Sequence, residues 1–122
     1  MQITCGTDII EIERIKESIE DLGKKFLNRI YTQKEIEYCE SKKGQKYQHY
    51  AARFAAKEAI FKAISKELND KYEIGWKDME IFNDEQGRPQ VKIKEVQKEN
   101  IDISISHCKE YAVAMVVMFV EK

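Results

Sequence analysis

The chain has 122 residues, enough for one domain with a modest hydrophobic core, and it is 43% hydrophobic and 35% charged. Its 21 Lys and Arg residues and 22 Asp and Glu residues leave a net charge of −1 with no block of one sign, which excludes a nucleic-acid binder held by bulk charge. The longest apolar run, Ala112 to Val120, is too short to cross a bilayer, so we expect no membrane partner.

The cysteines, Cys5, Cys39 and Cys108, are scattered and lack the short spacing of a metal site. An odd, scattered set without a signal peptide is typical of reduced thiols, so we expect a cytoplasmic protein.

The N-terminal ten residues predict a strand, in which Gly6 permits close approach of another backbone and Asp8 is an acid among apolar positions. Asp8 either caps the helix that follows or belongs to a functional site. That helix is predicted over residues 11–21, with isoleucines along one face.

Two short helices and one long helix are expected next. Residues 26–31 predict the first short helix. Thr32 and Glu35 form a capping box that begins the second, which ends near residue 41. The pattern then predicts one long helix from about residue 45 to residue 68.

The second half of the chain alternates apolar and polar residues as antiparallel strands do. Strands are expected at 76–82, 90–94, 101–107 and 111–120, with a turn at 83–89 and a helical turn at 95–100. This order of elements predicts an α+β fold in a single domain, 1–122: an antiparallel sheet with a long central helix and shorter N-terminal helices.

The last strand is apolar at nearly every position, so we expect both of its faces to be buried. One domain of this size has little material to cover both faces, which predicts a partner subunit packed about a symmetry axis.

The long helix carries a charge in an unexpected place. Glu58 lies at the centre of a sector that also holds Phe54 and Phe61, and a carboxylate among apolar groups is costly without a partner. One interpretation is an i,i+4 pair with Lys62 on a solvated face. A metal, a phosphate or a catalytic proton would each also explain a charge there.

Several separated motifs resemble one family, the 4′-phosphopantetheinyl transferases. Residues 6–14 are similar to the G-x-D-[IL]-x-x-[IL]-x-R opening of its short bacterial branch, the holo-acyl-carrier-protein synthases, and residues 53–62 are similar to the family's R-F-[AS]-x-K-E-A-x-x-K hallmark. Residues 83–89 and 104–107 resemble its Gly-[Lys/Arg]-Pro turn and its S-[IL]-[ST]-H strand.

The resemblance implies transfer of 4′-phosphopantetheine from coenzyme A to a serine of an acyl carrier protein for fatty acid biosynthesis, with release of adenosine 3′,5′-bisphosphate. It also implies a homotrimer with active sites between subunits. Asp8 and Glu58 would hold Mg²⁺, for which Mn²⁺ is a possible substitute. Glu58 would accept the serine proton, directly or through water, and Lys62 would bind phosphate oxygens.

The resemblance also implies contacts to the rest of coenzyme A. Arg53 and His107 would bind its adenosine-phosphate end, and the turn at Gly87, Arg88 and Pro89 would lie along the adenine.

An acidic carrier protein would dock on the first helices through Arg14, Phe26 and Arg29. The chain departs from the family there, because Glu17, Glu20 and Asp21 weaken the basic patch. A second departure is the segment 65–70, which replaces a Gly-rich loop and leaves its phosphate contacts undefined.

Two other classes of function are less consistent with the sequence than a transferase. A non-catalytic module that binds coenzyme A or a carrier protein has no need for the combination of Asp8, Glu58 and Lys62. A nucleic-acid-binding domain would rest only on Tyr47, Tyr50 and scattered lysines, and the mixed charges disfavour it.

Overall fold

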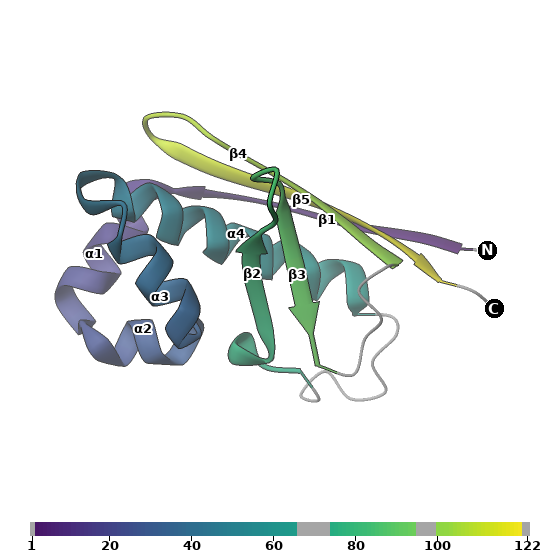
Figure 1. Ribbon diagram of the computed structural model, residues 1–122, viewed down its shortest axis with the longest axis horizontal. Helices are drawn as coiled ribbons and strands as arrows, with labels where there is room; N and C mark the ends of the chain where they lie inside the picture. Colours follow the sequence, from purple (N-terminus) through teal and green to yellow (C-terminus); the bar gives the residue numbers. More distant parts are fainter. Residues whose placement is uncertain (1, 66–73, 95–99, 121–122) are drawn as a thin grey trace.

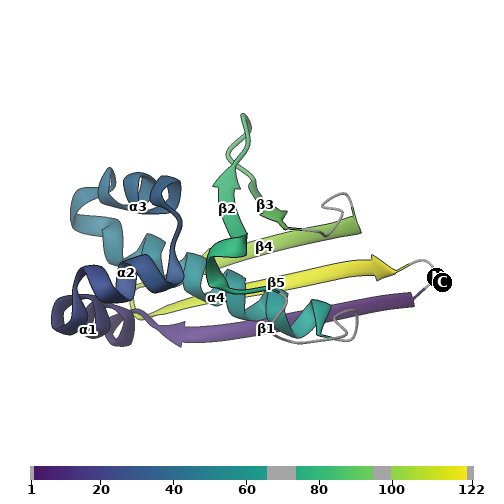
Figure 2. The same cartoon turned by 90° about the horizontal axis from the view of Figure 1, so that it is seen from below.

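A computed structural model describes residues 2–65, 74–94 and 100–120, with five strands assigned to two antiparallel sheets in these ranges. The larger sheet has the order β1–β5–β4, and Figure 2 shows its strands side by side against a long helix. Its strands are β1 (Gln2–Glu11), β4 (Ile101–His107) and β5 (Tyr111–Val120). The smaller sheet pairs β2 (Met79–Asn83) with β3 (Pro89–Ile93).

The long helix α4 (Lys46–Ile64) lies between the larger sheet and the β2–β3 hairpin, and three shorter helices gather at its N-terminal end (Figure 1). These helices are α1 (Ile12–Leu22), α2 (Lys24–Ile30) and α3 (Gln33–Glu40). Two single turns of 3₁₀ helix, η1 (Lys43–Gln45) and η2 (Trp76–Asp78), complete the elements assigned in the described ranges. Because α4 is covered on several sides, its buried residues are spread around the helix and do not form one stripe.

Helix α4 approaches the backbone of β1 closely at one point. A Cβ atom added to Gly6 would lie 2.0 Å from the carbonyl oxygen of Ala59, so only glycine fits there. The expectation of a close backbone approach at Gly6 is therefore confirmed. The contact holds together the two elements that carry Asp8 and Glu58.

The short N-terminal helices begin and end largely where local sequence signals predict. The side chain of Thr32 accepts a hydrogen bond from the Glu35 N–H, and the Glu35 carboxylate accepts one from the Thr32 N–H, which confirms the capping box of α3. Gly23 has a φ of 57° and separates α1 from α2, as glycine does where a left-handed residue is required.

Some expectations differ from the structure. The N-cap of α1 is Glu11, and Asp8 lies inside β1, so Asp8 is not a helix cap. The segment Trp76–Asp78 is a 3₁₀ turn, and strand β2 begins only at Met79. The predicted end of the long helix at residue 68 and most of the helical turn at 95–100 lie outside the described residues.

In the single chain only one face of the last strand is buried, and the expectation that a partner subunit covers the other face stays a prediction. Ala112, Ala114, Val116 and Met118 pack toward α4, whereas alternate residues, among them Val113 and Met115, are exposed. The period-two alternation of a strand places these two sets on opposite faces of the sheet. Within the described ranges, none of the helices is long and apolar enough to traverse a bilayer.

Candidate active site

Strand β1 and helix α4 bring together the three charged residues expected to act as a group. Lys62 Nζ lies 3.5 Å from Asp8 Oδ1 and donates a 2.8 Å hydrogen bond to the backbone carbonyl of Thr7. The Asp8 side chain is 17% exposed and the Lys62 side chain 54% exposed, so this pair is open to solvent on the lysine side. Glu58 lies one helical turn before Lys62 on α4.

Glu58 is half-buried beside a second negative charge. Burial raises the pKa of its carboxyl above 4.5, the charge of Asp8 raises it further, and Lys62 lowers it. The expected i,i+4 ion pair between Glu58 and Lys62 is not found among the described residues. Lys62 instead forms an ion pair with Asp8. Two carboxylates thus share one site with a single ammonium group.

This donor set fits a hard divalent cation. A cation bound by both carboxylates would offset their mutual repulsion, and oxygen ligands are those that Mg²⁺ prefers. The described residues include no group of three or more His, Cys, Asp or Glu side chains that could hold a metal. A Mg²⁺ ion at Asp8 and Glu58 would therefore take its other ligands from water and substrate, which is usual for this ion.

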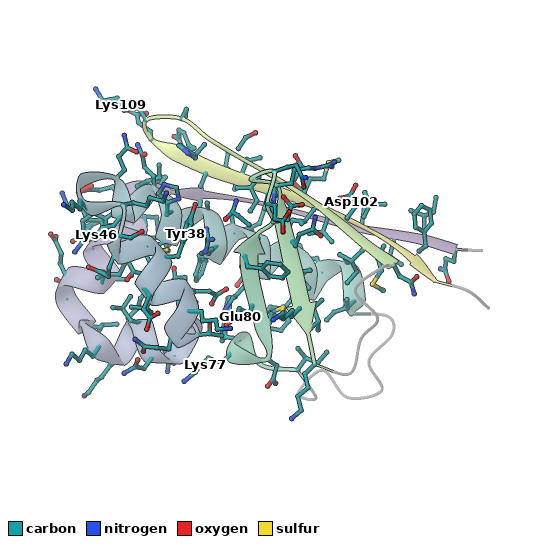
Figure 3. All side chains as sticks on the ribbon, viewed as in Figure 1. Tyr38, Lys46, Lys77, Glu80, Asp102 and Lys109 are labelled. Carbon is teal, nitrogen blue, oxygen red and sulfur yellow. The ribbon has the colours of Figure 1, made fainter. Side chains whose placement is uncertain are left out.

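A second part of the site is a cavity of about 160 Å³ near the N-terminal half of α4. Its lining includes Arg53, which is only 4% exposed. Arg53 Nη2 donates a 3.0 Å hydrogen bond to Asn83 Oδ1, and its guanidinium carbon lies 4.1 Å from the centre of the Tyr38 ring. Figure 3 shows Tyr38 projecting from α3 beside α4. Arg53 is thereby held by an amide and an aromatic face.

The turn between β2 and β3 brings two further predicted residues to this cavity, Gly87 and Pro89, and β4 brings His107. Gly87 has a φ of 81°, a backbone conformation that glycine adopts readily. The turn is ordered by Asp84, whose Oδ1 accepts 2.9 Å hydrogen bonds from the N–H groups of Gln86 and Arg88. The hydrogen bond from the Arg88 N–H is the largest cause that lowers the pKa of Asp84.

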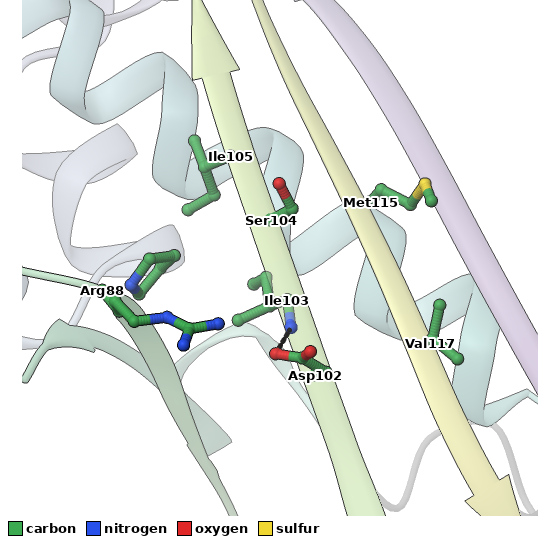
Figure 4. Close-up of a pocket in the computed structure, with 8 residues that line it drawn as sticks. Arg88, Asp102, Ile103, Ser104, Ile105, Met115 and Val117 are labelled. Carbon is green, nitrogen blue, oxygen red and sulfur yellow. Dashed lines mark hydrogen bonds between the residues drawn. The ribbon is translucent and has the colours of Figure 1, made fainter.

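Arg88 is not brought to the same cavity. It lines a separate hollow of about 300 Å³ together with residues of β4 and β5, and Figure 4 shows its guanidinium group directed toward Asp102. The turn thus presents Gly87 to one cavity and Arg88 to the other, and Pro89 lines both.

The residues expected to bind a carrier protein lie on the first two helices. Arg14 on α1 and Arg29 on α2 are exposed, and Phe26 is half-buried with its ring 6.3 Å from the ring of Tyr31.

Comparison with known proteins decides the family. Residues 4–116 match the model of the 4′-phosphopantetheinyl transferase superfamily. The chain belongs to the 4′-phosphopantetheinyl transferase superfamily. It is 45% identical to a holo-[acyl-carrier-protein] synthase of Ruminiclostridium cellulolyticum, over 97% of this chain and 92% of the relative. It is 46% identical to a protein of the same name from Thermodesulfovibrio yellowstonii, over 93% and 95% of the two chains.

Solved structures of this superfamily share the fold. The holo-(acyl-carrier-protein) synthase of Bacillus anthracis, solved in complex with CoA (3′,5′-ADP), matches with a TM-score of 0.77 at 36% identity, over 94% of each chain. The enzyme of Helicobacter pylori, solved with coenzyme A, matches with a TM-score of 0.77 at 29% identity, over 94% of this chain and 99% of that one.

A buried ion pair that no sequence motif predicted joins α4 to α3 beside the site residues of this phosphopantetheinyl transferase. Lys57 and Glu35 have fully buried side chains, and Lys57 Nζ lies 2.7 Å from Glu35 Oε1. Lys57 also donates hydrogen bonds to the carbonyls of Ile30 and Trp76. Burial lowers the pKa of the Lys57 ammonium, although the charge of Glu35 opposes this change. Lys57 stands next to Glu58 in the sequence and between Arg53 and Lys62, so the local pattern does not distinguish it as the buried charge.

Proposed function

We propose that this chain transfers the 4′-phosphopantetheine group from coenzyme A to a serine of apo acyl carrier protein and releases adenosine 3′,5′-bisphosphate, a step of fatty acid biosynthesis. The observation that carries the proposal is the meeting of Asp8, Glu58 and Lys62 at the contact of β1 with α4. The chain has this arrangement together with 45% identity to a holo-[acyl-carrier-protein] synthase over nearly its full length.

Asp8 and Glu58 hold Mg²⁺ in this proposal, and Mn²⁺ is a possible substitute. The ion supplies a positive charge that stabilises the phosphate oxygens during transfer. Lys62 adds a compact positive charge on the same face of α4. The two carboxylates support this assignment because the charge of Asp8 disfavours the charged form of Glu58 when no cation is bound.

Glu58 acts as the general base. It accepts the proton of the serine hydroxyl, directly or through a water molecule. The serine oxygen bonds to the phosphorus that carries pantetheine, and the bond from that phosphorus to the bridging oxygen breaks. The electron pair of that bond leaves with adenosine 3′,5′-bisphosphate, where Lys62 offsets the new charge.

The adenosine end of coenzyme A binds in the second part of the site. Arg53 and His107 contact its phosphate, and Gly87 and Pro89 lie along the adenine. Arg88 reaches the adenine from the adjoining hollow, which Pro89 also lines. The buried guanidinium of Arg53 supports this placement because it has no carboxylate partner among the residues lining the cavity.

The acyl carrier protein docks on α1 and α2 through Arg14, Phe26 and Arg29. Both arginines are exposed, which leaves their charges available to an acidic partner. The acids on the solvent side of α1 weaken this attraction, so carrier choice depends on the few basic residues.

The protein acts as a homotrimer in the cytoplasm, with residues 1–122 forming one transferase domain. The apolar outer face of β1 and β5 supports the trimer, and three free cysteines are compatible with a reducing compartment.

Mass spectrometry of an apo acyl carrier protein tests the proposed reaction. The carrier is incubated with this protein, coenzyme A and Mg²⁺, with and without EDTA. We expect a metal-dependent mass gain of roughly 340 Da on a serine, since the modification is a phosphodiester on its hydroxyl. No gain with several carriers, while coenzyme A still binds, would contradict the proposal and favour a binding module.

A further inference from the structure

The cavity that holds Arg53 is lined by one more basic side chain than the proposed contacts to coenzyme A include. Its lining residues include Arg53, His49 and His107 and no carboxylate. Arg53 is 4% exposed, and its Nε is buried without a hydrogen-bond partner. Its neighbours Asn83 and Tyr38 are uncharged. A buried cation without a counter-charge is unfavourable, so the cavity favours an anionic ligand.

His49 is placed to join Arg53 in binding that anion. It lies on α4 one helical turn before Arg53 and is half-buried. Its ring centre is 6.1 Å from that of His107 on β4 and 5.5 Å from that of Tyr38 on α3. Two imidazoles and one guanidinium, from two different elements, therefore face the same space.

We propose that His49 is a specificity residue that binds the phosphate monoester of coenzyme A, together with Arg53 and His107, and takes up a proton when it does so. The inference rests on the proposed function, because that function supplies coenzyme A as the ligand. The monoester carries close to two negative charges at neutral pH, whereas each phosphorus of the pyrophosphate carries one. The affinity for a dianion therefore increases more than the affinity for a monoanion when His49 adds a positive charge to the cavity.

The charges around His49 determine the direction of the pH dependence. Burial lowers the pKa of the His49 imidazole below 6.5, and Arg53, Lys42 and His107 lower it further. The ring is therefore mainly neutral at pH 7 without ligand. A bound dianion favours the charged imidazole and raises this pKa. The contribution of His49 to affinity is then complete at pH values below the pKa of the ligand-free state, and it is lost as pH rises through the pKa of the bound state.

The contribution of His49 to the affinity for the phosphate monoester can be measured by comparing the binding of two ligands. One ligand is coenzyme A, and the other is coenzyme A without its ribose phosphate. The ratio of their dissociation constants reports the phosphate monoester alone, and calorimetry at about pH 6, 7 and 8 gives its pH dependence. For the unmodified protein we expect the preference for coenzyme A to fall between pH 7 and pH 8, where the monoester is already a dianion and the imidazole loses its proton. The fall is at most about tenfold per pH unit, because a single proton is linked to binding.

Two variants separate charge from packing. His49→Phe keeps an aromatic ring beside Tyr38 and His107, and His49→Gln keeps a hydrogen-bond donor that takes up no proton. We expect both to reduce the preference by about three- to tenfold at pH 6 and to make it less dependent on pH. In buffers with different ionisation heats, both should also lose proton uptake on binding coenzyme A. The KM for coenzyme A should rise while kcat stays within about twofold, because His49 precedes the proposed base Glu58 by nine residues on α4, about 13 Å along the helix axis.

A preference and a proton uptake that are unchanged in His49→Phe would overturn the proposal and leave His49 with a packing role. Failure of the proposed function has a different signature, since the unmodified protein would then transfer nothing to any carrier. Circular dichroism of both variants establishes that each is folded before binding is compared.

Discussion

At the scale of single residues, Glu58 combines burial with a repelling neighbour. Its carboxyl is half-buried, and Asp8 adds a second negative charge nearby, yet the side chain remains at the junction of β1 and α4. A group this unfavourable by itself is typical of a functional site, because a structural role would be filled at lower cost by an uncharged residue.

The variant Glu58→Gln removes the charge and keeps the shape. We expect turnover to fall by orders of magnitude, because both a metal ligand and the proton acceptor are lost. Coenzyme A should still bind through the cavity at Arg53, as calorimetry can check. Glu37→Gln on the exposed face of α3 is the matched control and should leave turnover unchanged. Metal-dependent turnover within a few fold of the unmodified protein would contradict the assignment of Glu58.

At the scale of elements, the contact between β1 and α4 positions the site. Gly6→Ala would place a methyl group 2.0 Å from the Ala59 carbonyl oxygen, so the helix must move away from the strand. We expect a loss of about 1–3 kcal/mol in the free energy of unfolding and a large fall in turnover, since Asp8 and Glu58 separate. Urea denaturation and the carrier assay measure both effects.

Gly44→Ala is the control for that substitution. No atom lies within 4 Å of a Cβ built at Gly44, and its φ is not among the positive values. We expect its stability to be unchanged or slightly increased. If Gly6→Ala behaved like Gly44→Ala, the close approach of β1 to α4 would be unimportant for the site.

The buried pair of Lys57 and Glu35 connects α4 to α3 and to the hairpin. Glu35 Oε2 also accepts a 2.7 Å hydrogen bond from the Ile81 N–H, so one carboxylate links three elements. Lys57→Met should reduce the free energy of unfolding by about 3–5 kcal/mol, because it leaves Glu35 buried without a counter-charge.

A double-mutant cycle with Glu35→Gln tests this explanation. Glutamine carries no charge, and its single carbonyl oxygen can accept from only one of the Thr32 and Ile81 N–H groups, because its NH₂ group donates. The double variant should therefore be less destabilised than the sum of the single variants, by about 0.5–3 kcal/mol in urea denaturation. Strict additivity would show that the charges of Lys57 and Glu35 do not stabilise each other.

At the scale of the whole molecule, the outer face of the larger sheet carries large apolar side chains that the described part of the chain leaves exposed. Ile9 is 62% exposed and Ile3 is 61% exposed, and their cross-strand partners are Val113 and Phe119. Met115 is 51% exposed on the same face. A continuous apolar surface of this kind is typical of a subunit interface.

Val113→Glu places a charge in the middle of that face. We expect it to convert a trimer into monomers, because the buried charge would have no partner, and light scattering at micromolar concentration measures the change. Turnover should fall with the trimer if the active sites lie between subunits. Lys34→Glu on exposed α3 is the control. A monomeric unmodified protein would contradict both the trimer and the shared sites.

Much of the fold follows from local patterns in the sequence. The capping box at Thr32, the break between the first helices and the alternation along β4 predicted elements within a few residues of their observed bounds, since each depends on neighbours in the chain. The α+β class and the family follow from the sequence as well, because motifs keep their spacing. The assignment of Asp8, Glu58 and Lys62 to one functional group also came from those motifs.

Other features depend on which distant residues meet, and only the tertiary structure decides them. The sequence predicted that Lys62 follows Glu58 by one turn, but the structure pairs Lys62 with Asp8, 54 residues away. It also pairs Lys57 with Glu35, turns Arg88 away from Gly87, and leaves one face of β5 exposed. Local pattern determines the period and the ends of an element. Which charges are desolvated together, and which apolar face is covered, depends on long-range packing that the pattern does not contain.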